Sequence, residues 1–288
     1  MNYESLMVKP GTQVSLKDFD TRYTGKYKDK ADAAEKLKAD LTKLQQYQDV
    51  LYAQYDYALL LIFQAMDAAG KDGTIKHVMS GINPQGCQVF SFKAPSSEDL
   101  DHDFLWRTNR CLPERGRIGI FNRSYYEEVL VVRVQPELLD RQQLPESAKT
   151  PDIWKYRFED INNSEKYLVR NGIVILKFFL NVSKEEQKQR FLARINQPEK
   201  NWKFSASDAK VRLLWDDYMQ AYEDMLSNTS TEAAPWYVIP ADRKWFMHLA
   251  VANIICTKLK SLNLTYPTLS DAQKENLIKA KEILESEA

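Results

Sequence analysis

Apolar residues along this chain fall into two alternating patterns. Short continuous apolar runs predict strands that are buried on both faces, which are typical of a parallel sheet. Between these runs, apolar residues recur near a period of 3.6, which predicts amphipathic helices. The five predicted strands cover residues 57–63, 88–92, 118–121, 173–180 and 235–240. Their alternation with helical segments predicts an α/β fold, a doubly wound layer with a parallel sheet.

The helical segments set the expected organisation of the chain. A polar, irregular arm precedes the first of them, and the predicted helices cover residues 29–54, 74–79, 151–170 and 274–288. The third is expected to start with Thr150 as its cap and Pro151 as its first residue. The expected divisions are an N-terminal arm and helix packed on the core at 1–56, a core at 57–264 that includes a lid at about 183–215, and a C-terminal helix at 265–288.

Composition limits the class of partner. The chain has 288 residues, of which 44% are hydrophobic and 28% charged, and this fits one large α/β domain or two small ones. Its 40 basic residues balance 40 acidic residues. Global charge therefore gives no reason to expect a nucleic acid, and any other polyanion has to be met by a local basic cluster.

Three features favour a cytoplasmic protein. The cysteines at 87, 111 and 256 have no CxxC spacing and cannot all pair, which favours a reducing compartment. The N-terminal residues lack the basic-then-apolar pattern of a signal peptide. No apolar run approaches the ~20 residues of a membrane span, so we expect no membrane partner.

The turn after the first strand resembles a phosphate-binding loop. Residues 64–74 read Q-A-M-D-A-A-G-K-D-G-T, to be compared with the P-loop pattern G-x-x-x-x-G-K-[ST]. Ala65 replaces the first glycine and Asp72 replaces the hydroxyl residue. Backbone N–H groups and the dipole of the following helix would attract an anion, and Lys71 adds a positive charge. The alternative is a plain turn with a solvated lysine. The predicted phosphate-binding positions of the loop are Ala69, Gly70, Asp72, Gly73 and Thr74.

A carboxylate in this loop changes its expected chemistry. Asp67 would repel phosphate unless a cation lay between them. It therefore predicts Mg²⁺ coordination, or a base or orienter for an attacking oxygen. His77, His102 and His248 have no metal-binding spacing, and we interpret them as structural.

Polar residues follow the third predicted strand, where ligands bind in open α/β sheets. Walker B strands usually end in an aspartate that holds Mg²⁺. Asn122 stands at that position and can bind a metal-bound water or a phosphate without adding charge. Arg123 either faces the same crevice or pairs with Glu127. Arg133 lies in the apolar run V-L-V-V-R-V and needs an anionic partner, either a buried carboxylate or a ligand phosphate.

A basic segment follows the fourth strand. Ser183 is predicted to cap a helix in a capping box with Glu186, and a second helix is predicted near Ser207. Arg190 and Arg194 are spaced i,i+4 and share a helix face. Two short basic helices at this place resemble the lid of a nucleoside monophosphate kinase, which closes over phosphates. The alternative is a solvated helical hairpin. The basic residues crowded here are Lys184, Lys188, Arg190, Arg194, Lys200 and Lys203.

Together these segments resemble the polyphosphate kinase 2 family. The carrying segments are F-Q-A-M-D-A-A-G-K-D-G-T-I-K-H (63–77), V-F-S-F-K-A-P-S (89–96), I-G-I-F-N-R-S-Y-Y-E-E-V-L-V-V-R-V (118–134), K-N-W-K-F-S (200–205), W-D-D-Y (215–218) and T-S-T-E-A-A-P-W-Y-V-I-P-A-D-R-K-W-F (229–246). The resemblance implies a thymidylate-kinase-like P-loop kinase fold, a five-stranded parallel sheet flanked by helices with a helical lid. It also implies an enzyme that uses Mg²⁺, inorganic polyphosphate and a nucleotide, and that forms a homo-oligomer, a dimer or a tetramer.

The same resemblance implies roles for single residues. Asp67 matches the family's catalytic loop aspartate and is the implied Mg²⁺ ligand, directly or through water. Lys71 matches the phosphate-binding lysine, and Arg123 the arginine after the third strand. Asn122 replaces an aspartate, as is usual in members that accept both nucleoside mono- and diphosphates. The catalytic positions are thus Asp67, Lys71, Asn122 and Arg123. The further phosphate-binding positions are Lys93, Arg133, Arg190 and Arg194.

We therefore expect reversible transfer of the terminal phosphoryl group of polyphosphate to AMP and ADP, giving ADP and ATP. Adenine nucleotides are the expected acceptors, and guanine nucleotides are left open. One alternative is an ATP-dependent nucleoside monophosphate kinase on the same fold, against which the altered loop (Ala65, Asp72) and the basic lid count. The other is a non-catalytic binding protein for polyphosphate or nucleotides. Asp67 argues against it, because a pure anion receptor gains nothing from a carboxylate.

Overall fold

Five parallel strands form the centre of the protein. The computed structural model describes residues 3–287, and its strands are β1 (Ala58–Gln64), β2 (Cys87–Ser91), β3 (Ile118–Asn122), β4 (Ile173–Asn181) and β5 (Trp236–Pro240). They form one sheet in the order β2-β3-β1-β4-β5, and each of these pairings is parallel. The predicted five-stranded parallel sheet is confirmed, and each strand lies within one residue of its predicted bounds.

The strand order decides where a ligand can bind. β1 is central, and all of its residues are buried, as its continuous apolar run predicts. The chain leaves β1 toward β2 and β3 on one side and later crosses to β4 and β5 on the other. The loops after β1 and β3 therefore diverge at the carboxyl edge of the sheet, which is where open α/β sheets bind ligands.

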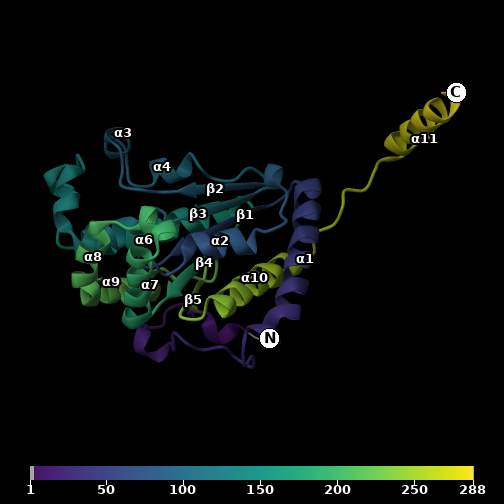
Figure 1. The fold of residues 1–288 in the computed structure, drawn as a ribbon. Helices are drawn as coiled ribbons and strands as arrows, with labels where there is room; N and C mark the ends of the chain where they lie inside the picture. The colour runs from purple at the N-terminus through teal and green to yellow at the C-terminus, as the bar shows by residue number, and fades with distance from the viewer. Residues whose placement is uncertain (1–2, 288) are drawn as a thin grey trace.

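Helices cover both faces of the sheet (Figure 1). One group is α1 (Lys30–Gln54), α2 (Lys71–Val78) and α10 (Lys244–Ser261), which pack against one another; the other is α6 (Ile153–Arg170) and α9 (Trp215–Thr229). The lid segment comprises α7 (Lys184–Asn196), the 3-10 turn Pro198–Lys203, α8 (Ala206–Val211) and the 3-10 turn Arg212–Leu214. The short helices are α3 (Ser97–Leu100), α4 (Trp106–Asn109) and α5 (Val131–Val134).

The predicted start of α6 is wrong by two residues. The helix begins at Ile153, with Asp152 at the N-cap position and no side-chain cap. The Thr150 carbonyl accepts a hydrogen bond from the Ile153 N–H at 3.1 Å. The Thr150 hydroxyl is buried without a partner among the described residues. Thr150 therefore begins the turn that leads into α6 rather than capping the helix.

Only one of the two hydrogen bonds of the capping box predicted for α7 is present. Ser183 Oγ accepts from the Glu186 N–H at 3.1 Å, as expected for a cap. The Ser183 N–H donates instead to the Asp242 carboxylate of the β5–α10 loop at 2.8 Å. Glu186 is free of that role and pairs with Arg190 Nε at 2.8 Å. A contact from a distant loop thus replaces the local one.

The N-terminal arm is ordered along the β5 edge. Met7 pairs antiparallel with Tyr237, and the Val8 N–H donates to the Trp236 carbonyl at 2.9 Å. Further along, the Val14 N–H donates to Ser227 Oγ at 2.9 Å. The arm covers an edge that would otherwise present unpaired backbone groups to other chains.

The C-terminal helix α11 (Asp271–Ser286) projects away from the body on an extended segment (Figure 1). It begins three residues before the predicted start, where Ser270 and Gln273 form a capping box; the predicted end, Ala288, lies outside the described residues. All of α11 is exposed, including Leu277 and Leu284. Among residues 3–287, no helix has both the length and the hydropathy that a membrane span needs.

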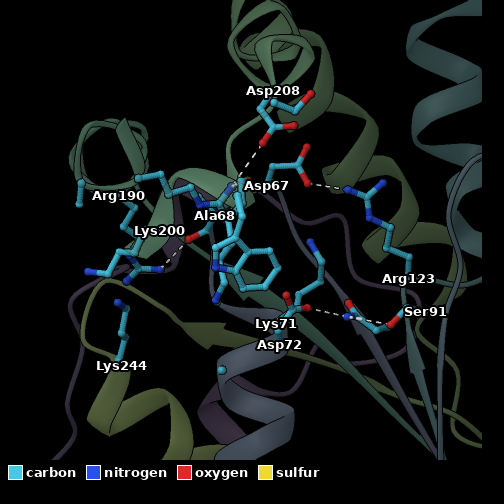
Figure 2. A pocket seen from close by; sticks show the side chains of 18 of the residues that line it. Asp67, Ala68, Lys71, Asp72, Ser91, Arg123, Arg190, Lys200, Asp208 and Lys244 are labelled. Carbon is cyan, nitrogen blue, oxygen red and sulfur yellow. Dashed lines mark hydrogen bonds and ion pairs between the residues drawn. The ribbon is translucent and has the colours of Figure 1, made fainter. Parts of the chain in front are cut away.

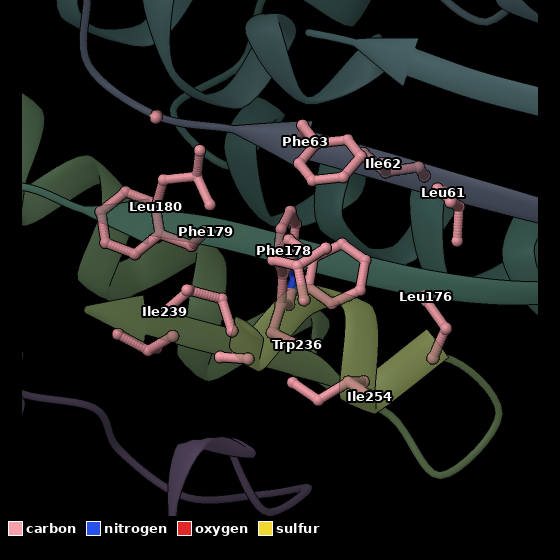
Figure 3. Close-up of a cluster of buried hydrophobic side chains, with 14 of the residues drawn as sticks. Leu61, Ile62, Phe63, Leu176, Phe178, Phe179, Leu180, Trp236, Ile239 and Ile254 are labelled. Carbon is pink, nitrogen blue, oxygen red and sulfur yellow. The ribbon is translucent and has the colours of Figure 1, made fainter. Parts of the chain in front are cut away.

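A fully buried ion pair stabilises the core beside the aromatic cluster of β1, β4 and β5 (Figure 3). Lys177 of β4 lies 2.6 Å from Glu165 of α6, and both side chains are excluded from solvent. Lys177 Nζ also donates to the Tyr126 hydroxyl at 2.8 Å and to the Thr229 carbonyl at 2.7 Å. The Tyr125 and Tyr126 hydroxyls donate to Glu165 at 2.8 and 2.7 Å. The network holds the turn that follows β3.

We predict that Glu165→Ala destabilises the protein by about 3–5 kcal/mol, because it leaves Lys177 buried without a counter-charge. Burial already lowers the pKa of Lys177. Urea unfolding followed by circular dichroism measures the change. Glu159→Ala, at an exposed position of the same helix, is the control and should alter stability by less than about 0.5 kcal/mol. Equal stability of the two variants would contradict the prediction.

Candidate active site

A cavity of about 740 Å³ opens at the carboxyl ends of β1, β2 and β3. The loop after β1 forms its floor, and residues from the lid segment and from the start of α10 form the facing walls (Figure 2). The cavity therefore lies at the edge that the strand order makes available for a ligand.

The loop after β1 turns through two left-handed positions before α2 begins. Ala68 has φ 62° and Gly70 has φ 113°. The φ of Gly70 favours glycine, and a Cβ there would come within 3.0 Å of Met247 Cε, which would have to shift by a few tenths of an ångström. Backbone strain at a non-glycine residue such as Ala68 is common at functional sites.

Lys71, the first residue of α2, folds back under this loop. Its Nζ donates to the carbonyl groups of Ala65 at 2.7 Å and Met66 at 3.3 Å. Burial, followed by the nearby charge of Arg123, lowers the pKa of Lys71 to about 8. The side chain is thus a cation held at the loop by neutral acceptors, which an anionic ligand can replace.

Asp67 and Arg123 form an ion pair at the edge of the cavity (Figure 2). Arg123 Nη2 lies 2.5 Å from Asp67 Oδ1, and Nη1 lies 3.5 Å from Glu127. Glu127 and then Asp67 raise the pKa of Arg123. Arg123 is also left-handed, with φ 64°. Arg123 therefore pairs with Glu127, one of the two alternatives that the sequence left open, and also lines the crevice.

Asn122, at the end of β3, links the first turn of α2 to the end of β2. Its Nδ2 donates to Asp72 Oδ1 at 2.7 Å and lies 3.4 Å from Ser91 Oγ at the end of β2. Asp72, which replaces the hydroxyl residue of the P-loop pattern, is therefore held by a neutral donor and lines the cavity.

Arg190 holds the loop after β1 in place through hydrogen bonds to its carbonyl groups. Its Nη1 donates to the carbonyls of Ala69 at 2.5 Å and Ala68 at 3.2 Å, and its Nη2 donates to Ala241 at 2.6 Å. With the Glu186 pair, these bonds use most of the guanidinium donors. Arg190 is 8% exposed, so it joins α7, the loop after β1 and the loop after β5 into one unit.

Arg194, one turn further on, has a different environment. It lies 3.3 Å from Asp208 of α8 and donates to the Lys203 carbonyl at 3.2 Å. Burial, followed by the charge of Asp67, raises the pKa of Asp208. Three further cations, Lys200, Lys203 and Lys244, line the cavity.

The structure brings most of the predicted site residues to this cavity. Those that line it are Asp67, Gly70, Lys71, Asp72, Gly73, Lys93, Asn122, Arg123, Arg190 and Arg194. Three others do not: Ala69 and Thr74 are fully buried, and Thr74 Oγ1 donates to the Gly70 carbonyl at 3.0 Å. Arg133 pairs with Asp224 at 2.5 Å, so a carboxylate and not the cavity supplies its anionic partner.

Several lining residues were not predicted as site residues. Lys200 and Lys203 were visible in the basic segment, and Trp202, 78% exposed, lies between them. Lys244 directly follows the β5 loop, a position that the rule for strand ends could have flagged. His248 was interpreted as structural, yet it lines the cavity and stacks on His77 at 4.4 Å. Burial lowers its pKa to about 4.

A smaller cavity of about 230 Å³ adjoins the first. Lys93, Ala94 and Arg123 line both. Its other walls come from the segment between β2 and β3 and from the turn after β3, with Phe104 and Gln142 among the lining residues. Two connected compartments therefore meet at Arg123.

The carboxylates of the loop fit a divalent cation whose coordination shell is completed by water and substrate phosphates. Among the described residues, no group of three or more acidic, histidine or cysteine side chains is placed to hold a metal. Mg²⁺ is usually held by one or two carboxylates together with water and substrate phosphates. Asp67 and Asp72 both line the cavity, and carboxylates are the type of protein ligand that such an ion uses.

The sheet order, the glycine-containing loop with Lys71 and the basic lid define a P-loop phosphotransferase. Comparison with known proteins agrees: residues 26–266 match the model of the family described as Polyphosphate kinase 2. This chain belongs to the polyphosphate kinase 2 family, as the sequence motifs predicted.

Individual relatives and a solved structure are similar over nearly their whole length. An ADP-polyphosphate phosphotransferase of Rhodopseudomonas palustris is 52% identical over 278 residues, 96% of each chain. An AMP/ADP-polyphosphate phosphotransferase of Meiothermus ruber is 42% identical over 272 residues, covering 94% of this chain and 98% of the relative. The crystal structure of Polyphosphate Kinase 2 from Arthrobacter aurescens is 39% identical, with a TM-score of 0.86 and 96% of each chain covered.

We predict that alanine substitutions of the two lid arginines differ in their effect on the stability of the protein. Arg190→Ala should destabilise the protein by at least about 2 kcal/mol, because it leaves several buried carbonyl groups without donors. Arg194→Ala, at a half-buried position, should change stability by less than about 0.5 kcal/mol and still weaken phosphoryl transfer. Chemical unfolding and turnover of both variants measure the difference. Wild-type stability of both variants would contradict the role of Arg190 in holding the loop after β1 in place.

Proposed function

We propose that this protein transfers the terminal phosphoryl group of inorganic polyphosphate to ADP and to AMP. The phosphorus–oxygen bond to the chain breaks, and a new one forms to the terminal phosphate of the acceptor. The observation that supports this proposal most is the set of cations that line the same cavity as Asp67 and Lys71, namely Arg194, Lys200, Lys203 and Lys244. It suits a donor that is phosphate along its whole length, and the names of the two relatives support the same donor.

Positioning and charge carry the reaction in this proposal. Phosphoryl transfer needs alignment of donor and acceptor and stabilisation of the charge on the transferred group. Lys71 exchanges the carbonyls of Ala65 and Met66 for a phosphate oxygen. Arg123 lies between the two cavities and can contact both substrates. The lid supplies Arg194 once the donor competes with Asp208 for it.

The acceptor is assigned to the smaller cavity. It lies beyond Arg123, and its aromatic and polar walls suit a nucleoside better than a continuous polyanion. Asn122, which precedes Arg123 and lines the larger cavity, carries no charge. We propose that this neutral residue permits a monophosphate as well as a diphosphate to approach, with adenine as base and guanine open.

Mg²⁺ is the proposed cofactor, with Asp67 as its main ligand, directly or through water, and Asp72 beside it. When bound, the ion would neutralise phosphate charge and hold the two substrates together. We further propose a cytoplasmic homo-oligomer. The free cysteines suit a reducing compartment, and the exposed apolar side chains of α11 suit a protein–protein contact.

An acceptor assay tests the proposed function. Purified protein is incubated with long-chain polyphosphate, Mg²⁺ and AMP, ADP, GMP or GDP, and the nucleotides are separated by chromatography. We expect ATP from ADP, and ADP followed by ATP from AMP. Transfer to AMP from ATP alone, without polyphosphate, would favour the nucleoside monophosphate kinase, and binding without turnover would favour the non-catalytic alternative. Lys71→Ala should abolish transfer without unfolding the protein.

The lowered pKa of Lys71 predicts a pH dependence of anion binding. Protonated Lys71 attracts phosphate, so the affinity for tripolyphosphate should fall as the pH rises through about 8, by at most about tenfold per pH unit. Lys71→Arg keeps its charge throughout this range and should lose that dependence. Calorimetric titration of both proteins measures it, and their comparison cancels the ionisation of the ligand itself. Identical profiles would contradict the prediction.

A further inference from the structure

A second large groove continues from the active-site cavity. Its volume is about 990 Å³, and it lies between the first half of α1, the end of α2 and the start of α10. Lys244 and His248 line both the groove and the active-site cavity. The two spaces therefore meet at the first turns of α10, on the side of Lys200 and Arg190 (Figure 2).

The groove has an excess of unpaired positive charge. Four cations line it, Lys30, Lys38, Arg243 and Lys244, and none of them has a carboxylate within ion-pair distance among the described residues. Both lining carboxylates are already engaged. Glu186 pairs with Arg190 at 2.8 Å, and Asp242 accepts from Thr21 and from the Ser183 N–H and faces Arg22.

The remaining walls strengthen the electrostatic attraction of the groove for an anion. Leu37, Leu41 and Trp245 give the groove an apolar side, and walls of low dielectric focus the field of neighbouring cations. The stacked imidazoles of His77 and His248 add hydrogen-bonding groups at the junction of the two spaces. The start of α10 lies at the same end, and the dipole at a helix N-terminus attracts an anion.

We propose that this groove binds the distal part of the polyphosphate chain, beyond the units held in the active-site cavity. The inference rests on the proposed donor. A long polyanion in the cavity has to leave it somewhere, and the groove offers the continuation that shares Lys244 and carries Lys30, Lys38 and Arg243. The groove thus gives long chains contacts that short chains cannot make.

The experiment compares two donor lengths on two matched variants. Lys30→Gln/Lys38→Gln removes two charges from the groove. Lys43→Gln/Lys166→Gln removes two charges from exposed positions that line neither space. Binding of tripolyphosphate and of long-chain polyphosphate is measured by calorimetry at several salt concentrations, with KM for each donor in parallel.

For the groove variant we expect affinity for long-chain polyphosphate to fall about five- to tenfold at low salt. The magnitude of the slope of its logarithm against the logarithm of salt should fall by about 1.4 to 1.8, as for the loss of two phosphate contacts. Affinity for tripolyphosphate and kcat should stay unchanged, and the control variant should bind both donors as the wild type does.

Equal losses for both donor lengths, or equal losses in the two variants, would overturn the proposal. An unchanged affinity of the groove variant for long chains would overturn it as well. Failure of the proposed function has a different signature, because the wild-type protein itself would then not transfer phosphate from either donor.

Discussion

The site depends on one guanidinium group. Arg190 donates to carbonyls on both sides of the cavity floor, at Ala68 and Ala69 after β1 and at Ala241 after β5, and it pairs with Glu186 in its own helix. A loop with left-handed turns at Ala68 and Gly70 would not hold one shape by local preference alone. The hydrogen bonds of Arg190 fix that shape, and the position of Lys71 follows from it.

The second constraint is that the partly or fully buried cations at the loop after β1 have partners within the protein. Arg123 is held by Asp67 and Glu127, Arg194 by Asp208, and Lys71 by backbone carbonyls. These internal acceptors satisfy the charges while no phosphate is present, since an unpaired buried charge is costly. A phosphate chain has to compete with them, and the energy of binding is therefore linked to release of the lid and loop contacts.

Local patterns predicted the elements well because each depends on nearby residues. The bounds of the strands predicted from apolar runs, and of the helix α1 predicted from its helical period, agree with the structure within about one residue. The start of α6 and the reciprocal half of the α7 capping box were predicted wrongly. In each case a contact that local rules omit decides the outcome, a turn bond to the Thr150 carbonyl and a bond from Ser183 to the distant Asp242.

By itself, the sequence determined the parallel sheet, the loop with Asp67 and Lys71 and the family, because these are written in contiguous residues. Only the tertiary structure decided which charges meet. It turned Arg133 toward Asp224, turned Arg190 onto backbone carbonyls and brought Lys244 and His248 to the cavity. Such pairings join residues far apart in the chain, and they depend on how helices pack on the sheet, which no local spacing encodes.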